Sequence, residues 1–196
     1  MKADTDKWFG GLGEHFLKGI GLHKGQAVLD FGCGSGAYAL PAAQVVGNEG
    51  RVYALDKDRW ALDQVKARAR SRGLGNITCL HSSGELKIPL EEKSVDAILL
   101  YDVIHSWYFT PAARQELLNE IYRVARPNAV VSVYPSHMDL GTARRALEEA
   151  GFCFERRLRI RLLHNGRLVV DDVLNFRKRQ KDAGRPVRDI PSADRR

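Results

Sequence analysis

Residues 27–37 read Ala-Val-Leu-Asp-Phe-Gly-Cys-Gly-Ser-Gly-Ala, and this stretch decides the fold. Its apolar start, 27–31, predicts a buried strand, and Gly32, Gly34 and Gly36 follow directly, before an Ala-rich segment. Glycines let the backbone turn tightly and approach a ligand closely, and the start of a helix offers free N–H groups. The stretch therefore predicts a strand, a ligand-binding loop and a helix, in that order.

The chain beyond this loop keeps alternating between strand-like and helix-like segments. Further strands are expected at 51–56, 77–80, 95–101 and 130–134, and helices at about 37–46, 58–72, 110–125 and 140–150. Asp58 and Thr110 are suited to capping two of these helices, and Pro111 suits a first helical position. Trp60, Leu62, Val65 and Ala69 lie near the spacing of one apolar helix face. Such alternation is typical of an α/β fold with a parallel sheet.

The two ends of the folded region differ from this pattern. Two long strand-like runs, 152–163 and 168–176, flank the turn signal Asn165-Gly166, which predicts an antiparallel hairpin. Residues 5–20 predict one leading helix, whose apolar side carries Trp8, Phe9, Leu12, Phe16 and Leu17. The expected layout is five parallel strand–helix units that end in an antiparallel hairpin.

Charge is distributed unevenly along the 196 residues. The whole chain has 31 Lys and Arg against 24 Asp and Glu, a formal net charge of +7. Residues 177–196 hold eight basic and three acidic side chains, so this segment carries +5 and leaves +2 for the other 176 residues. Its low apolar content predicts a disordered basic tail. We expect residues 1–176 to form a single domain with a short N-terminal helix.

Cysteine content and hydropathy limit the class of protein. The three cysteines, Cys33, Cys79 and Cys153, are too few and too scattered for a disulfide framework or a CxxC zinc site. No apolar run approaches the roughly 20 residues that a membrane helix needs, and no stretch at the N-terminus resembles a signal peptide. A cytoplasmic protein without a membrane span is expected.

Two carboxylates indicate which nucleotide the glycine loop accepts. Asp56 closes the second strand, where an acid can take both hydroxyls of a ribose. Asp30 stands two residues before Gly32, at the mouth of the loop. A pyrophosphate placed beside that anion would be disfavoured by roughly a few kcal/mol, whereas a cationic ligand would be favoured. Asp30 favours S-adenosylmethionine, which carries an ammonium and a sulfonium, over NAD.

Residues 28–36 and 50–56 resemble the first two motifs of class I S-adenosylmethionine-dependent methyltransferases. The sequence is most similar to the ubiquinone/menaquinone-biosynthesis type, and the similarity continues through 88–96, 101–105 and 118–127. It covers about residues 22–176. The resemblance implies a Rossmann-like sheet of seven mostly parallel strands, ending in an antiparallel hairpin, with helices on both faces.

The resemblance also implies a role for particular positions in binding the cofactor, with S-adenosylhomocysteine as product. The glycines would shape the methionine side, Asp30 would lie near the ammonium, Asp56 would bind the ribose, and Lys57 would flank the adenine. The implied cofactor-binding residues are Asp30, Gly32, Cys33, Gly34, Gly36, Asp56, Lys57, Ser83, Gly84, Glu85 and Tyr101. Ser83 departs from the family pattern, which has Asp there, and Asn128-Ala129 replaces a common Gly-Gly.

The carboxyl ends of the fourth and fifth strands carry the candidate groups for chemistry on the acceptor. His105 and His137 are the candidate general bases, with lining of the pocket as the alternative role of each. These histidines could in principle bind a metal together with Asp102 and Asp139, but their spacing is unremarkable and no metal is expected. Residues 107–109, Trp-Tyr-Phe, would either stack on a flat acceptor or form an apolar wall.

The expected function is methyl transfer by in-line displacement to a small-molecule acceptor. An RNA or protein methyltransferase is the main alternative, with Arg157, Arg159, Arg161 and the basic tail as contacts, so a nucleic-acid partner is not favoured but stays open. A NAD(P)-binding oxidoreductase and a binding module without catalysis are weaker alternatives. The acceptor site is either open or completed by a second subunit, so a homodimer is also considered.

Overall fold

The strand that leads into the glycine loop, β1 (Ala27–Phe31), lies inside a seven-stranded sheet of order β3-β2-β1-β4-β5-β7-β6. The computed structural model describes residues 2–179. The other strands are β2 (Arg51–Asp56), β3 (Ile77–His81), β4 (Val95–Tyr101), β5 (Ala125–Tyr134), β6 (Phe152–His164) and β7 (Arg167–Lys178). Strands β1 to β5 pair in parallel, and β7 pairs antiparallel with both β5 and β6. The predicted fold class and terminal hairpin are confirmed.

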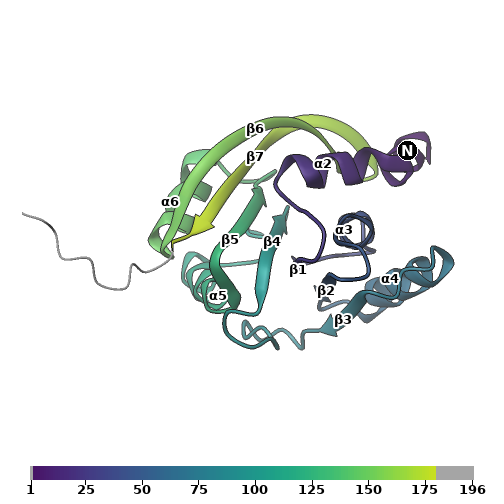
Figure 1. Cartoon of the computed structure of the whole chain (residues 1–196). Coiled ribbons are helices and arrows are strands. Elements are labelled where there is room, and N and C mark those ends of the chain that lie inside the picture. The colour runs from purple at the N-terminus through teal and green to yellow at the C-terminus, as the bar shows by residue number, and fades with distance from the viewer. Residues whose placement is uncertain (1, 180–196) are drawn as a thin grey trace, which may run out of the picture.

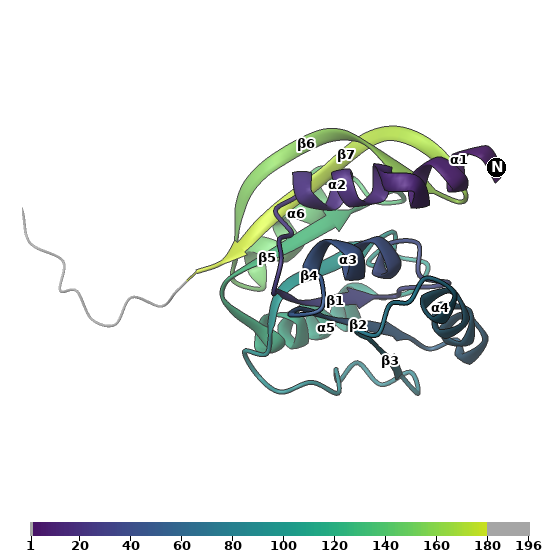
Figure 2. The same ribbon diagram turned by 45° about the vertical axis from the view of Figure 1, so that its right-hand side comes forward.

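Helices cover both faces of the sheet (Figures 1 and 2). The chain begins with α1 (Lys2–Lys7), a π-helical segment η1 (Trp8–Leu12) and α2 (Gly13–Gly19), followed later by α3 (Ala39–Val46), α4 (Arg59–Ser71), α5 (Pro111–Val124) and α6 (Leu140–Glu149). Side chains of α2, α3 and α4 share one apolar core cluster, and those of α5 and α6 share the other. Among residues 2–179, no helix combines the length and apolar character needed to cross a membrane.

Local sequence chemistry accounts for most of the helix boundaries. The Asp58 side chain accepts a hydrogen bond from the Trp60 N–H and caps α4, while Thr110 caps α5 with Pro111 at the first helical position. Trp60 does not join the apolar face: its side chain is 69% exposed. It lies two positions before Leu62, and residues two apart point to different sides of a helix.

The observed bounds of β7, in the hairpin, and of β5 differ from the bounds expected from the sequence. β7 continues through Arg177 and Lys178, whose Nζ donates to the carbonyl oxygens of Tyr122 and Ala125. The rest of the expected basic tail, from residue 180, lies outside the described residues. β5 begins at Ala125, and its register with β4 shifts before Val130 because the intervening residues bulge, with Asn128 at φ 66°.

The arrangement of the strands places a crevice at one edge of the sheet. The chain runs from β1 outward to β2 and β3, then returns to the other side of β1 to form β4. The connections after β1 and β4 therefore leave in opposite directions from neighbouring strands. In open α/β sheets, ligands bind in the crevice outside the carboxyl ends of strands at such a switch point.

Candidate functional site

The glycine loop after β1 is held against the end of β2 by its own backbone. The N–H groups of Gly32 and Cys33 both donate to the Leu55 carbonyl oxygen, at 2.9 and 3.0 Å. The Gly34 N–H donates to Asp56 Oδ2 at 2.7 Å, and the Gly36 N–H donates to the Cys33 carbonyl oxygen. These four N–H groups are thus bonded within the protein and are not available to cradle a phosphate.

All three glycines of the loop have positive φ, between 50° and 86°. A Cβ at Gly32 would lie 2.7 Å from Val103 Cγ2, and one at Gly36 would lie 3.1 Å from Val65 Cγ2. A Cβ at Gly34 would meet nothing within 4 Å. Gly32 and Gly36 are therefore required for close packing, whereas Gly34 leaves open space above the loop.

Asp30 is buried at the end of β1 with one oxygen unsatisfied. Its side chain is 2% exposed, and Oδ2 has no hydrogen-bond partner among the described residues. Burial raises the pKa of Asp30 to about 7, an effect that the Ala39 N–H opposes and the Asp56 charge adds to. A buried carboxylate oxygen without a partner is costly, and a cationic N–H donor from a ligand would relieve that cost.

Asp56 lies at the end of β2, at the entrance of the crevice. Its two oxygens accept from the backbone N–H groups of Gly34 and Asp58, at 2.7 and 2.9 Å. Each carboxylate oxygen has a second lone pair, so the side chain can still accept from two ligand hydroxyls. Backbone bonds thus fix the orientation of an acid that retains capacity for a ligand.

A cavity of about 370 Å³ opens between these segments. Its walls come from the loop after β1, the end of β2, the loop after β3 and the loop after β4. The lining residues are Phe31, Gly32, Gly34, Leu55, Asp56, Lys57, Ser82, Gly84, Glu85, Leu86, Asp102, Val103, Tyr108 and Phe109. The Lys57 Nζ lies 5.6 Å from the centre of the Tyr108 ring, which links two of these walls. The cavity therefore offers the Asp56 carboxylate for polar groups and an apolar surface for a flat ring, with Asp30 behind the loop.

The structure brings together six of the residues expected to bind the cofactor. These are Gly32, Gly34, Asp56, Lys57, Gly84 and Glu85. Asp30 and Gly36 support the loop from behind, and Ser82 rather than its neighbour Ser83 lines the cavity. Cys33 is buried beneath the loop, and burial raises the pKa of its thiol, so it is not a reactive thiolate.

Tyr101 does not line the cavity and belongs to the core. Its hydroxyl shares a 2.8 Å hydrogen bond with Ser132 Oγ, and its ring contacts Tyr38 and Phe16. Burial raises the pKa of this phenol above its usual range. Tyr101 therefore packs the loop from below.

Sequence reasoning missed four of the lining residues: Phe31, Leu55, Ser82 and Val103. The signal was available, because Phe31 and Leu55 are in the last positions of β1 and β2, and Ser82 and Val103 follow β3 and β4 closely. Residues at the carboxyl ends of parallel strands face the crevice as a group. A search of every strand end, beyond the charged residues, would have found them.

The leader segment holds the far side of the glycine loop. Trp8 is fully buried, and its Nε1–H donates to the Ala37 carbonyl oxygen at 2.7 Å. Its ring contacts Phe16 and Tyr38, and the Tyr38 hydroxyl donates to the Leu163 carbonyl oxygen at 2.6 Å. The leader, the loop and β6 are therefore joined through one aromatic cluster.

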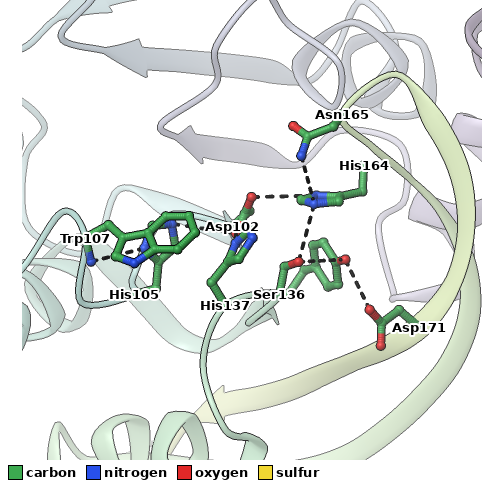
Figure 3. Close-up of polar contacts among 9 residues, drawn as sticks. Asp102, His105, Trp107, Ser136, His137, His164, Asn165 and Asp171 are labelled. Carbon is green, nitrogen blue, oxygen red and sulfur yellow. Dashed lines mark hydrogen bonds and ion pairs between the residues drawn. The ribbon is translucent and has the colours of Figure 1, made fainter. Parts of the chain in front are cut away.

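Beyond the cavity, three imidazoles surround Asp102 (Figure 3). His137 Nδ1 lies 2.6 Å from Asp102 Oδ1, and His105 Nε2 lies 3.7 Å from the same oxygen. His164 Nδ1 lies 3.6 Å from Oδ2. Asp102 has φ 54°, an uncommon conformation for a residue with a side chain, and such strain is concentrated at functional sites.

Two of the candidate bases thus meet at one carboxylate. Asp102, His105 and His137 place potential ligand atoms within 4.8 Å of one another, as a metal site would. Asp139, the fourth residue weighed from the sequence, instead caps α6 by accepting from the Thr142 N–H. The Trp107 N–H donates to His105 Nδ1 at 3.3 Å, so the neutral ring carries its proton on Nε2, the nitrogen that faces Asp102. A protonated nitrogen cannot ligate a cation, so this hydrogen bond opposes metal binding.

Comparisons with known proteins agree with this geometry. The sequence pattern of a family described as "Methyltransferase domain" matches residues 28–128. A demethylmenaquinone methyltransferase of Geobacillus kaustophilus is 29% identical over 60% of this chain and 48% of its own length. A 2-phytyl-1,4-naphtoquinone methyltransferase of Trichormus variabilis is 30% identical over 64% of this chain and 56% of its own length. The chain thus spans about half the length of these curated relatives.

A solved structure extends the similarity to most of the fold. A SAM-dependent methyltransferase from Aquifex aeolicus superposes with a TM-score of 0.71 at 27% identity, over 85% of this chain and 89% of that one. The family match begins inside β1 and includes the glycine loop, Asp56 and the loop after β4. The family's sequence pattern matches half of the chain, and the solved structure superposes on most of its fold. The chain therefore belongs to the methyltransferase domain family.

Proposed function

We propose that this chain binds S-adenosylmethionine in the cavity between the carboxyl ends of β1, β2 and β4 and transfers its methyl group to a small-molecule acceptor. The observation that carries the proposal is Asp30, a buried carboxylate with one unpartnered oxygen behind the glycine loop. The α-ammonium of this cofactor is a cationic donor suited to that oxygen. Asp56, at the entrance, suits the ribose hydroxyls.

The proposed cofactor fits the rest of the cavity by its chemistry. Gly34 leaves open space where a side chain would obstruct the ligand. Leu55, Leu86 and Val103 supply apolar surface for the adenine and exclude water, and Lys57 and Glu85 lie among the polar groups at the wall. When bound, the cofactor supplies a methyl group activated by a positively charged sulfur. The protein's residues then have to hold an acceptor in line with that methyl group.

A dinucleotide fits less well. Binding a pyrophosphate at the loop would require free N–H groups, but those of Gly32, Cys33 and Gly34 donate to β2. Ionised Asp30 behind the loop would also repel a phosphate. Both features disfavour a NAD(P)-dependent oxidoreductase.

A macromolecular acceptor is the second candidate, and the arginine strand is its main support. Arg157 and Arg159 are half-exposed or more, but both lie against Asp172, at 2.6 and 3.4 Å. Their charge is thus partly neutralised within the hairpin. Of the three arginines on this face of β6, Arg161 has no carboxylate partner among the described residues. A small-molecule acceptor remains the better-supported class, and two relatives have names that specify quinone-type compounds.

Transfer of a radiolabelled methyl group tests this proposal. The full chain is incubated with tritiated S-adenosylmethionine and, separately, with small phenols and quinols, with total RNA and with a protein extract. Label is expected in the small molecules. If label appeared only in RNA or protein, the acceptor would be a macromolecule and not a small molecule. If the chain failed to bind S-adenosylhomocysteine, the proposal itself would be overturned.

Asp56→Ala is the matched variant for the cofactor site. Loss of the hydrogen bonds to the ribose is expected to weaken binding of S-adenosylhomocysteine by about 10-fold or more. Asp63→Ala is the control, because Asp63 is an exposed acid whose partner is the exposed Lys66 on α4. Equal affinity of the Asp56 variant and the wild type would refute the assignment of Asp56 to the ribose.

A further inference from the structure

We propose that His137, oriented by Asp102, is the general base of this enzyme, that its acceptor is a flat aromatic hydroxyl, and that His105 positions Asp102 without itself taking a proton. The inference rests on the proposed function and specifies the chemistry at the acceptor end of the same site. It follows from the hydrogen bonds among four side chains, the exposure of two rings and the position of Asp102 on the cavity wall.

His137 is arranged as a base. Its Nδ1 lies 2.6 Å from Asp102 Oδ1, a distance at which the neutral ring donates Nδ1–H to the carboxylate. The lone pair then lies on Nε2, which has no hydrogen-bond partner among residues 2–179. The side chain is 31% exposed, so part of the ring is open to an acceptor. Asp102 fixes the tautomer and stabilises the imidazolium that forms, as the acid of a catalytic triad does.

His105 lacks this arrangement. Its ring is 3% exposed, and Nδ1 already accepts the Trp107 N–H. The remaining nitrogen, Nε2, carries the proton and faces Asp102 Oδ1 at 3.7 Å. Neither nitrogen is free to take a proton from an acceptor. His105 therefore supports Asp102 from the buried side.

The other titratable groups near His137 and Asp102 come from the loop after β4 and from strands β5, β6 and β7. His105 comes from the loop after β4, and His164 from the end of β6, with its Nδ1 3.6 Å from Asp102 Oδ2. Asp171 of β7 accepts from the Tyr134 hydroxyl, whose oxygen also lies 3.1 Å from Ser136 Oγ, the neighbour of His164 Nε2. Burial raises the pKa of Tyr134 to about 12, so this phenol stays neutral through the working range.

The surroundings of the base select the acceptor. The Trp107 ring lies 4.5 Å from the His137 ring, tilted by 36°, and Trp107 is 74% exposed, as it would be if it awaited a second flat ring. Both oxygens of Asp102 face imidazole nitrogens, so this carboxylate is engaged in orienting the histidine rings. A flat aromatic ring could stack on Trp107 while its hydroxyl donates to His137 Nε2. Asp102 lines the cavity, so His137, which it contacts, lies next to the wall of the proposed cofactor site.

The step balances without any further reactant. The acceptor O–H bond breaks and its proton passes to His137 Nε2, while an O–C bond forms to the methyl carbon and the S–C bond of the sulfonium breaks. The products are a methyl aryl ether, a neutral thioether and an imidazolium, which then releases its proton to solvent. Removal of a phenolic proton by a positioned base contributes about 10²- to 10⁴-fold in rate.

A series of phenols of graded acidity, from 4-methoxyphenol to 4-nitrophenol, provides the test. For weakly acidic phenols, His137→Gln is expected to lower kcat by about 10²- to 10⁴-fold. For 4-nitrophenol at pH 8.5, which is already ionised, the loss should shrink to a few-fold. The wild-type rate should rise with pH and then level off, whereas the variant rate should keep rising as the acceptor ionises. A purely structural role would slow every phenol equally.

Two further variants separate the roles. His105→Gln is expected to lower the rate but to retain the plateau in the pH profile, because the base is still present. His15→Gln, a change at an exposed histidine of α2, is the control and should leave rates unchanged. A pH profile that loses its plateau in the His105 variant and keeps it in the His137 variant would reverse the assignment.

A measurement that needs no turnover accompanies the kinetics. Long-range ¹H–¹⁵N spectra of the histidine rings report the tautomer, and His137 is expected to carry its proton on Nδ1 in the neutral form, with the preference lost in Asp102→Asn. The Nε2–H tautomer in the wild type would overturn the proposal. So would activity that is abolished by a chelator and restored by zinc, since the cluster would then be a metal site.

The failure of this inference is distinguishable from that of the proposed function. Binding of S-adenosylhomocysteine without methylation of any phenol would overturn the aromatic hydroxyl as acceptor and leave the cofactor site intact. Failure to bind S-adenosylhomocysteine would overturn the proposed function, and with it the assignment of His137 as the general base.

Discussion

At the scale of single residues, Asp30 links stability, pH and ligand binding. Its pKa is raised from the usual 3.8 to about 7, chiefly by burial. For a group whose pKa is raised on folding, the stabilising contribution is fully present below the unfolded value and is lost as pH rises through the folded value. The free protein therefore bears the cost of an ionised, buried carboxylate above about pH 7, and a cationic ligand group would remove it.

Asp30→Asn tests this linkage. The variant is expected to have a higher Tm than the wild type at pH 8 and a smaller advantage at pH 5, because the contribution of Asp30 is only partly lost between its ordinary pKa of 3.8 and about 7. It should bind S-adenosylhomocysteine about 10- to 100-fold more weakly at pH 8, since a charge-assisted hydrogen bond is lost. Thermal unfolding and calorimetry at the two pH values measure both effects. Tighter binding by the variant at pH 8 would contradict the assignment of Asp30 to the ammonium.

Single residues also show how far the sequence alone could go. Asp30, Asp56 and the glycines could be predicted because they are close in sequence to the strand ends that position them. Asp102, His105 and His137 could also be placed near one another from the ends of β4 and β5, but their hydrogen bonds and the contribution of β6 could not. His164 reaches the cluster only through the antiparallel hairpin, and its place in the chain gave no sign of that contact.

At the scale of elements, the leader segment positions the glycine loop. Phe16, Leu17 and Trp8 are buried in the core, and Trp8 also donates to the carbonyl oxygen of Ala37, at the end of the loop. The η1 segment contains a kink at Gly11, with φ 126°, between α1 and α2. A segment outside the matched family region thus contributes to the shape of the candidate site.

Replacement of Trp8 tests this coupling. Trp8→Phe retains an aromatic ring but leaves the Ala37 carbonyl oxygen without its partner, so a loss of about 1–3 kcal/mol in the free energy of unfolding is expected. Weaker binding of S-adenosylhomocysteine should accompany it, because the loop loses a support. Trp60→Phe is the control: its side chain is 69% exposed, and a change within about 0.5 kcal/mol is expected. Equal stabilities of the two variants in urea would contradict the role of Trp8.

The elements that followed simple periodicity were predictable, and those shaped by local irregularity were less so. The hairpin turn has Asn165 and Gly166 at φ 48° and 73°, the left-handed pair that their sequence favours. The bulge in β5 was missed, because Pro127 interrupts an apolar run and hides the pairing of Ala125 with Val95. The leader segment was predicted as one helix, and the kink at Gly11 divides it.

At the scale of the whole molecule, the strand order matters more than the net charge. The formal charge of +7 lies largely in residues 177–196, of which Arg177 and Lys178 belong to β7. The crevice at the β1/β4 switch point, by contrast, is lined by three acids, Asp56, Glu85 and Asp102, and framed by a fourth, Asp30. A site of this composition favours a cationic ligand, and that conclusion does not depend on the tail.

Calorimetric titration of the full chain with S-adenosylhomocysteine, and in parallel with NAD, tests the central claim most directly. We predict one binding site per chain for S-adenosylhomocysteine, with a proton released on binding at pH 6 as Asp30 ionises, and no heat of binding with NAD. Binding of NAD, together with no binding of S-adenosylhomocysteine, would contradict the account.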